Sequence, residues 1–166
     1  IGLPRPLVTG RLLKDLASLG LRSLHFVRAC LCEKSYMSGS LWKNGEYRRH
    51  LLEGLAQSGN TLLPDVRLHE SFDGCLSLFT AASGAAPEDD IVRCVLDPRG
   101  CGALDTLPPR RSAVLAIGPE RGWTPAELEK FTATGFGICG MGKRILRTEA
   151  AALAASAITL FRMGLM

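Results

Sequence analysis

The sequence predicts an α/β domain with a parallel sheet and helices on both of its faces. Strand-like and helix-like patterns alternate along the 166 residues, and this alternation is typical of parallel sheets. Three strand-like runs are followed by a turn that contains Gly or Pro, as expected where the carboxyl ends of parallel strands meet one sheet edge. The length fits a single domain, residues 1–166, that buries about two-thirds of its unfolded surface.

Helices are expected where apolar residues recur every three or four positions. Gly20 and Gly59 follow the first two such segments and are suitable stops. Thr124 is a good N-cap for a later helix, with Pro125 at the first helical position and Glu127 completing a T-x-x-E capping box. The expected helices span residues 7–19, 46–59, 74–82, 125–133 and 148–163.

Strands are expected in short apolar runs between these helices. They span residues 22–29, 65–70, 91–96, 113–117 and 136–141. Three stretches are expected to lack regular structure: a polar loop over 30–45, a surface connection over 83–90 and a Pro-rich loop over 101–111.

The composition excludes several classes of protein. An apolar share of 46% with 22% charged residues is that of a globular domain. No apolar run approaches the roughly 20 residues needed to cross a bilayer, so no membrane partner is expected. The net charge of +4 permits a nucleic-acid partner without requiring one. No targeting signal is recognisable, so a cytoplasmic location is expected; an organelle stays open if the sequence is a piece of a longer protein, since it begins with Ile1.

The cysteines and histidines give no sequence signature of a metal site. The six cysteines are Cys30, Cys32, Cys75, Cys94, Cys101 and Cys139. They lack C-x-x-C spacing, and no histidine cluster lies beside them in the sequence, so no metal is expected. Cys94 and Cys139 lie in strand-like runs and are expected to be buried free thiols, which fits a reducing compartment. His25, His50 and His69 are expected to be structural or surface residues.

A ligand pocket is expected where the turns after residues 96, 117 and 141 meet. Glycines in these turns allow the backbone to approach a ligand closely. Residues 137–143, "GICGMGK", match the phosphate-loop pattern G-x-x-x-x-G-K. The next residue is Arg144 rather than Ser or Thr, and the helical pattern begins later, near Thr148. This segment is therefore not expected to bind phosphate.

Two C-terminal motifs in combination carry a family resemblance. The sequence "IGPERGWTPAELEKF" begins at Ile117, and "GFGICGMGKRILRTEAAALAA" begins at Gly135. Within the second, Lys143, Arg144 and Arg147 form a basic patch before an Ala-rich helix for which Thr148 is the expected N-cap. Together with the opening "LPRP" and the "EKSY" loop, these motifs resemble the RsmE-type ribosomal RNA uridine-N3 methyltransferases of the SPOUT superfamily.

The resemblance implies a fold, a cofactor and an oligomeric state. The fold would be a SPOUT-type parallel sheet with a deep trefoil knot at its C-terminus, an exception to the rule that chains are unknotted. The cofactor would be S-adenosylmethionine, and the active site would lie at a homodimer interface. The family's N-terminal RNA-binding, PUA-like domain has no counterpart in this sequence. The implied cofactor residues are Leu96, Asp97, Pro98, Ile117, Gly118, Pro119, Glu120, Gly122, Met141, Gly142, Ile145 and Leu146.

The resemblance also assigns residues to the RNA substrate. Arg147 is expected to act on the uridine or its phosphate, where a guanidinium would stabilise the anion formed when N3 loses its proton. Glu120 is expected to orient the substrate or to brace the loop. The expected RNA contacts are Arg28, Lys34, Arg121, Arg144 and Arg147. Two positions depart from the family pattern: Arg121 stands where a Gly is usual, and Lys143 where a Pro is common. No residue is identified as the general base.

The function implied is therefore S-adenosylmethionine-dependent methylation of uridine N3 in small-subunit ribosomal RNA. Two alternatives remain open at this point. One is a SPOUT-fold RNA-binding or ribosome-assembly protein without catalytic turnover. The other is a SPOUT methyltransferase that acts on another RNA.

Overall fold

The computed structural model describes residues 1–80, 90–100, 102–106, 108 and 110–166. Most of the expected connection over 83–90, and Cys101, lie outside the described residues. The strands are β1 (Ser23–Val27), β2 (Asp65–His69), β3 (Ile91–Leu96), β4 (Gly102–Ala103), β5 (Ser112–Ile117) and β6 (Gly137–Gly140). The α-helices are α1 (Pro6–Ser18), α2 (Ser40–Lys43), α3 (Tyr47–Ser58), α4 (Phe72–Leu76), α5 (Pro125–Ala133) and α6 (Thr148–Arg162), and the 3-10 turns are η1 (Lys34–Ser38), η2 (Ser77–Phe79) and η5 (Leu104–Thr106).

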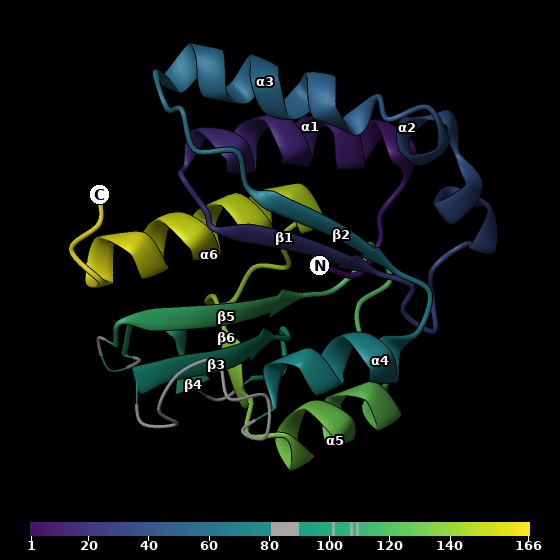
Figure 1. Cartoon of the computed structure of the whole chain (residues 1–166). Helices are drawn as coiled ribbons and strands as arrows, with labels where there is room; N and C mark the ends of the chain where they lie inside the picture. The colour runs from purple at the N-terminus through teal and green to yellow at the C-terminus, as the bar shows by residue number, and fades with distance from the viewer. Residues whose placement is uncertain (81–89, 101, 107, 109) are drawn as a thin grey trace.

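The strands form two parallel sheets where a single sheet was expected. One has the order β1-β2 and the other β4-β6-β3-β5. Residues 1–3 join them at the carboxyl ends of β1 and β5. The amide of Gly2 donates to the carbonyl of Ile117 at 2.8 Å, while the amide of Val27 donates to the carbonyl of Ile1 at 2.9 Å. The parallel direction of the strands is confirmed, and this short segment lies between the sheets (Figure 1).

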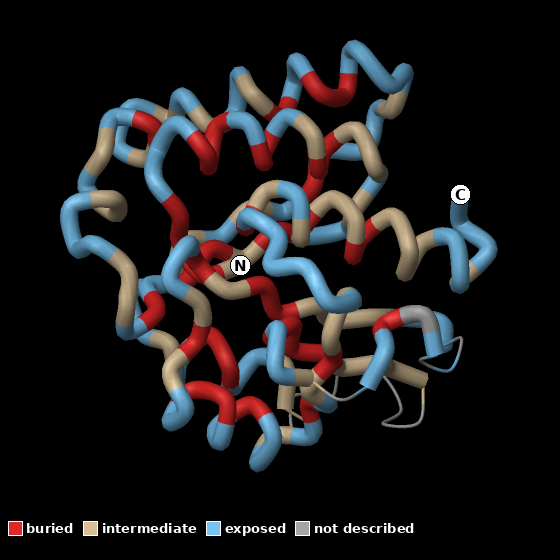
Figure 2. Tube along the Cα trace, turned by 180° about the vertical axis from the view of Figure 1, so that it is seen from behind, coloured by how far each residue is buried: buried red, intermediate tan, exposed pale blue. Residues whose placement is uncertain are grey.

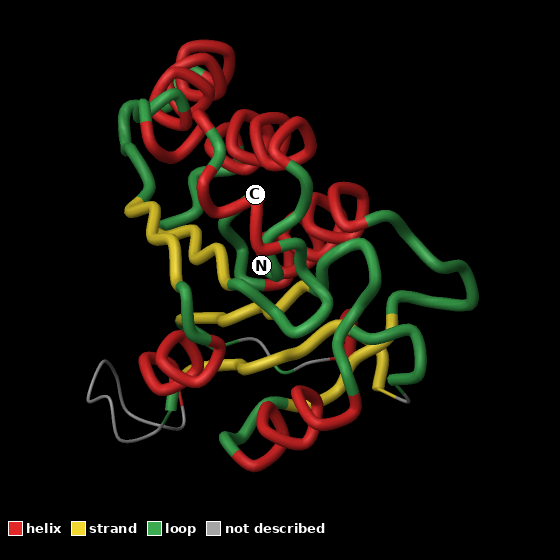
Figure 3. The backbone as a smooth tube through the Cα atoms, turned by 90° about the vertical axis from the view of Figure 1, so that its right-hand side faces the viewer, coloured by secondary structure: helices red, strands yellow, loops and turns green. Residues whose placement is uncertain are grey.

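Helices cover both faces, as predicted. Helices α1, α3 and α6 lie on one face, and α4 and α5 lie on the other (Figures 1 and 3). Alternation along β3 divides the core accordingly: Cys94 and Leu96 belong to the cluster under α1 and α6, and Val95 to the cluster under α4 and α5. Figure 2 shows the buried residues, in red, both on the helices and on the strands between them.

A cavity of about 540 Å³ opens between the two sheets. Residues along β1 and β5 line it, together with Trp123 and the side chains of α4 and η2. Its lining includes Ile1, Val27 and Ile117, so the cavity reaches the joint at residues 1–3. Of the twelve predicted cofactor residues, its lining includes Ile117.

The element boundaries follow local sequence signals closely where those signals are strong. Gly59 has a φ of +69° and ends α3, and Thr124 and Glu127 form the complete capping box of α5. The loop expected over 30–45 contains η1 and α2, and the loop expected over 101–111 contains β4 and η5. Within the described residues, no helix is both long and apolar enough to span a bilayer.

Candidate functional site

The carboxyl ends of three strands lie side by side. In the register of the second sheet, Leu96 is opposite Ile117 on one side and opposite Cys139 on the other. The amide of Asp97 extends this pairing by donating to the carbonyl of Cys139 at 3.1 Å. The predicted meeting of the turns after β3, β5 and β6 at one edge is therefore confirmed.

The turn after β3 is fixed by a buried carboxylate. Asp97 is 5% exposed and accepts hydrogen bonds from the amide and the Nε of Arg99, both at 2.8 Å. The hydrogen bond from the Arg99 guanidinium lowers the pKa of Asp97 below its ordinary value. Gly100 then passes so close to β6 that a Cβ would lie 2.5 Å from the carbonyl carbon of Cys139. Asp97 thus holds the turn, and Pro98 is left exposed.

The turn after β5 is tight and requires glycine at two positions. The amide of Gly122 donates to the carbonyl of Pro119 at 2.8 Å, and Gly122 has a φ of +71°. A Cβ on Gly118 would lie 3.1 Å from the Cα of Gly122, whereas a Cβ on Gly122 would meet nothing within 4 Å. Gly118 is needed by the turn itself, and Gly122 faces open space. Arg121 is exposed and, like every described residue other than glycine, has a negative φ, so the turn accepts it without backbone strain.

Glu120 ties this turn to the start of α1. Its Oε1 accepts hydrogen bonds from the amide of Arg5 at 3.0 Å and from the Nε of Arg5 at 3.3 Å. The next large side chain, Trp123, is 4% exposed and packs edge-on against Phe131 and Phe72. In this structure Glu120 therefore braces the turn, one of the two roles predicted for it, while a role toward substrate stays a prediction.

The segment between β6 and α6 is exposed and both basic and apolar. Lys143, Arg144 and Arg147 are exposed, and Ile145 and Leu146 expose 83% and 39% of their surface. Gly142 has a φ of +94°, and its Cβ direction points to open space. Met141 at the start of the segment is partly buried. Large apolar side chains exposed beside cations indicate a surface that is covered in the functional state.

Thr148 joins two of the three turns. Its hydroxyl donates to the carbonyl of Gly118 at 3.1 Å, and Thr148 is 5% exposed. The prediction that Thr148 is the N-cap was wrong: Arg147 occupies that position, and its side chain makes no cap hydrogen bond. The Thr148 hydroxyl therefore links α6 to the turn after β5 and does not cap its own helix.

The phosphate-loop match is excluded by the position of the helix. Residues 137–140 form β6, and α6 begins at Thr148, five residues after Lys143. In a phosphate loop the helix begins at the lysine. The backbone of this segment therefore differs from that of a phosphate loop.

A buried carboxylate connects the loop after β1 to this edge, and sequence reasoning missed the connection. Glu127 is 6% exposed. Its Oε1 accepts from the amide of Cys30 at 2.8 Å, and its Oε2 accepts from the amide and hydroxyl of Thr124, also at 2.8 Å. Arg28, two residues before Cys30, is exposed, and its contact with RNA stays a prediction. Lys34 is exposed farther along the same connection, on η1.

The histidines pack within the fold, and the two cysteines that the sequence predicted to be buried free thiols are buried and free. His50 of α3 lies against Gly10 of α1, and His25 and His69 are hydrogen-bonded to each other. Cys94 and Cys139 are buried free thiols, and each described cysteine is free. Burial raises the pKa of the Cys94 thiol.

Comparison with known proteins identifies the family. The model of the RNA methyltransferase domain family matches residues 1–160. The chain belongs to this family. It is 39% identical over 165 residues to ribosomal RNA small subunit methyltransferase E of Treponema pallidum, an alignment that covers 96% of this chain and 60% of that protein. It is 31% identical over 159 residues to ribosomal RNA small subunit methyltransferase E 1 of Borreliella burgdorferi, covering 96% of this chain and 64% of the relative. The chain thus spans less than two-thirds of the length of either relative.

Solved structures of other methyltransferases share the fold. Ribosomal RNA small subunit methyltransferase E of Neisseria gonorrhoeae, solved bound to S-adenosyl methionine, superposes with a TM-score of 0.79 at 24% identity, over 96% of this chain and 63% of that one. The SpoU methyltransferase AviRb of Streptomyces viridochromogenes, solved with AdoMet, has a TM-score of 0.62 at 17% identity, over 96% of this chain and 55% of that one. The α/β architecture predicted from the sequence is confirmed by these likenesses.

Proposed function

We propose that this RNA methyltransferase domain transfers a methyl group from S-adenosylmethionine to N3 of a uridine in small-subunit ribosomal RNA. The observation that carries the proposal is the alignment of Leu96, Ile117 and Cys139 at one sheet edge, with the following turns joined by Thr148. Ligands of open parallel sheets bind at the carboxyl edge of the strands. The relatives named as ribosomal RNA small subunit methyltransferase E, and the cofactor bound in two structural neighbours, support the same reaction.

The residues at the edge fit an adenosyl cofactor. The Cβ directions of Gly122 and Gly142 are open, so a ligand can approach the backbone there. The apolar side chains of Ile145 and Leu146 offer an exposed surface for an adenine ring. The buried Asp97, held by Arg99, fixes the third turn. When bound, the cofactor supplies an electrophilic methyl group. The chain's part is to hold this edge rigid and to exclude water from it.

The basic residues around the edge fit an RNA substrate. Arg147, Arg144 and Arg121 are exposed on the two turns that Thr148 joins. Removal of the N3 proton leaves negative charge on the uracil oxygens, and the guanidinium of Arg147 would stabilise that charge. Arg28 and Lys34 would bind phosphates on the neighbouring loop. The target uridine must be unpaired or locally opened for N3 to be reached.

A C-terminal knot and a homodimer complete the proposal. The contact between Thr148 and Gly118, and the packing of α6 against β5 and α1, support a chain that returns through the loop preceding it. The exposed Ile145, which precedes α6, and the exposed Phe161, near the C-terminal end of α6, support a subunit interface that involves this helix. A PUA-like RNA-binding domain outside residues 1–166 would supply further contacts to the RNA.

Calorimetric titration with S-adenosylmethionine, S-adenosylhomocysteine and ATP tests the cofactor assignment. We expect micromolar binding of the first two and none of ATP. Methyl transfer to small-subunit ribosomal RNA, followed by nucleoside analysis, tests the substrate. Cofactor binding by the full-length protein without transfer to any ribosomal RNA would refute the catalytic proposal and favour an assembly role.

A further inference from the structure

Three residues with metal-binding side chains meet outside the cofactor edge. His25 lies on β1, His69 ends β2, and Cys75 lies on α4. The Nδ1 of His25 is 2.9 Å from the Nε2 of His69, and one ring nitrogen of each histidine and the Sγ of Cys75 lie within 4.8 Å of one another. His25 precedes His69 by 44 residues, whereas Cys75 lies on the helix that directly follows β2, so only the fold brings His25 to the other two.

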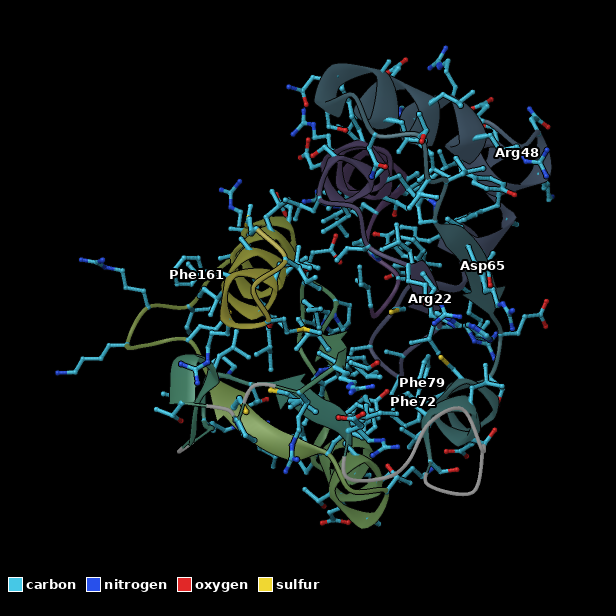
Figure 4. All side chains as sticks on the ribbon, turned by 60° about the vertical axis from the view of Figure 1, so that its left-hand side comes forward. Arg22, Arg48, Asp65, Phe72, Phe79 and Phe161 are labelled. Carbon is cyan, nitrogen blue, oxygen red and sulfur yellow. The ribbon has the colours of Figure 1, made fainter. Side chains whose placement is uncertain are left out.

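The register of β1 and β2 brings the two imidazoles together. Val27 is paired with His69, so His25, two residues before Val27, faces the same side of the sheet. The rings are nearly parallel, with centroids 5.1 Å apart. Helix α4 packs on this side and buries Cys75, which is 8% exposed. Phe79 closes the cluster by packing edge-on against His25, and Figure 4 shows Phe79 beside Phe72 below the strand that carries Asp65.

We propose that His25, His69 and Cys75 form a binding site for Zn²⁺ or a metal ion of similar preference. Imidazole nitrogen and thiolate sulfur are the ligands that zinc prefers, and three protein ligands with one open position make a recognised zinc geometry. Tetrahedral coordination with Zn–N near 2.0–2.1 Å and Zn–S near 2.3 Å requires about 3.3 Å between the nitrogens and about 3.6 Å from each nitrogen to the sulfur. The nitrogens, 2.9 Å apart, need to separate by a few tenths of an ångström.

The three side chains of the cluster are uncharged before an ion binds. Burial lowers the pKa of His25 to about 4, lowers that of His69 and raises that of Cys75, so both imidazoles and the thiol are neutral at pH 7. On binding, the hydrogen bond between the rings breaks, and the proton that lay between them moves to the outer nitrogen of the same ring. The thiol loses one proton to solvent, so one proton is released for each ion bound.

The surroundings offer a route for the ion. His25 and Cys75 both line the cavity between the two sheets. The amide of Arg28 donates to the carbonyl of His69 at 3.0 Å, so an ion here would also stiffen the start of the loop that leads toward Cys30 and Glu127. An ion held here would join the β1-β2 pair to α4 and leave its fourth position to a solvent ligand, and the site does not depend on the proposed methyl transfer.

Titration of the metal-free protein with Co²⁺ tests the site directly. We expect one equivalent to produce the charge-transfer absorption of a cobalt–thiolate bond, and Zn²⁺ to displace it. Cys75→Ser is expected to abolish this absorption, and His69→Gln to weaken Co²⁺ binding more than about tenfold. The matched control is Cys30→Ser, which removes an exposed thiol outside the cluster and should leave the titration unchanged.

Thermal unfolding with and without Zn²⁺ provides a second readout. Zn²⁺ should raise the midpoint of the wild type and of Cys30→Ser, but not of Cys75→Ser, because an ion that binds the folded state stabilises it. If Cys75→Ser does not fold, His69→Gln carries the comparison, because His69 lies partly exposed at the end of a strand. Absence of the thiolate band in the wild type, or its loss in Cys30→Ser, would overturn the proposal and leave the cluster as a hydrogen-bonded histidine pair.

Discussion

Glu127 offers a sharp test of how the edge of the sheet is held together. Its two carboxylate oxygens accept from main-chain amides of different segments, Cys30 and Thr124, and the side chain is buried. In Glu127→Gln the amide group provides one acceptor oxygen where the carboxylate has two. One of the two N–H groups therefore loses its acceptor and faces an NH₂ group instead.

The structure allows the cost of each substitution to be worked out. A hydrogen bond to a charged group contributes about 1.5–3 kcal/mol, and a buried donor left without a partner costs a similar amount. We expect Glu127→Gln to lower the free energy of unfolding by about 2 kcal/mol and Glu127→Ala by about 4 kcal/mol. Glu129→Gln is the matched control, because Glu129 is exposed on the same helix, and its expected effect is within about 0.5 kcal/mol.

Urea denaturation gives the free energies, and hydrogen exchange at the Cys30 amide shows whether the loop has been released. In the full-length protein, the KM for RNA should rise in Glu127→Gln more than the dissociation constant for the cofactor, because Arg28 and not the cofactor turns lies on the released loop. Equal stability of the Glu127→Gln and Glu129→Gln variants, with unchanged exchange at Cys30, would refute this reasoning.

Three further predictions concern the turns. Arg147→Ala should sharply reduce methyl transfer while cofactor binding stays within about threefold, because its proposed role is on the substrate side; an equal loss of cofactor affinity in calorimetry would contradict that role. Thr148→Val removes the hydrogen bond to Gly118 and should cost about 1 kcal/mol in unfolding experiments, whereas Thr148→Ser should retain most of it; if the two variants behave alike, the hydroxyl does not join the turns. The pKa of Asp97 is lowered in the folded state, so its stabilising contribution is present above its ordinary pKa of 3.8 and is lost as pH falls through the lowered value. The decrease in the urea midpoint between pH 7 and about pH 3 should therefore be larger for the wild type than for Asp97→Asn. Equal decreases in the two proteins would show that another group is responsible.

Local chemistry made α5 fully predictable from sequence. Its cap, its first-turn proline and its closing glutamate lie within four residues, and each acts through neighbours in the chain. The three strand ends were also predictable, because parallel strands leave little choice about where their turns meet. The two-residue strand β4 had no local signal, since Gly102 and Ala103 pair with β6 only through the tertiary fold.

The contacts that sequence reasoning missed all connect distant segments. The second hydrogen-bonding partner of Glu127 lies 97 residues away, and the hydroxyl of Thr148 acts 30 residues away. The sequence already explained both residues as helix-cap residues, so it gave no sign of a second, long-range partner. The joint between the two sheets uses the backbone of Gly2, a residue with no side chain to mark its position between β1 and β5.

The packing of α6 against α1 has a consequence for synthesis on the ribosome. The apolar side of α1 that includes Leu12 and Leu13 belongs to the same core cluster as Ala152 and Ala155 of α6. During translation that surface is made early, and the part of its cover that α6 supplies is made about 140 residues later, which at 5–20 residues per second is on the order of ten seconds. In that interval the nascent chain presents an uncovered apolar surface on which chaperones or premature association would act first.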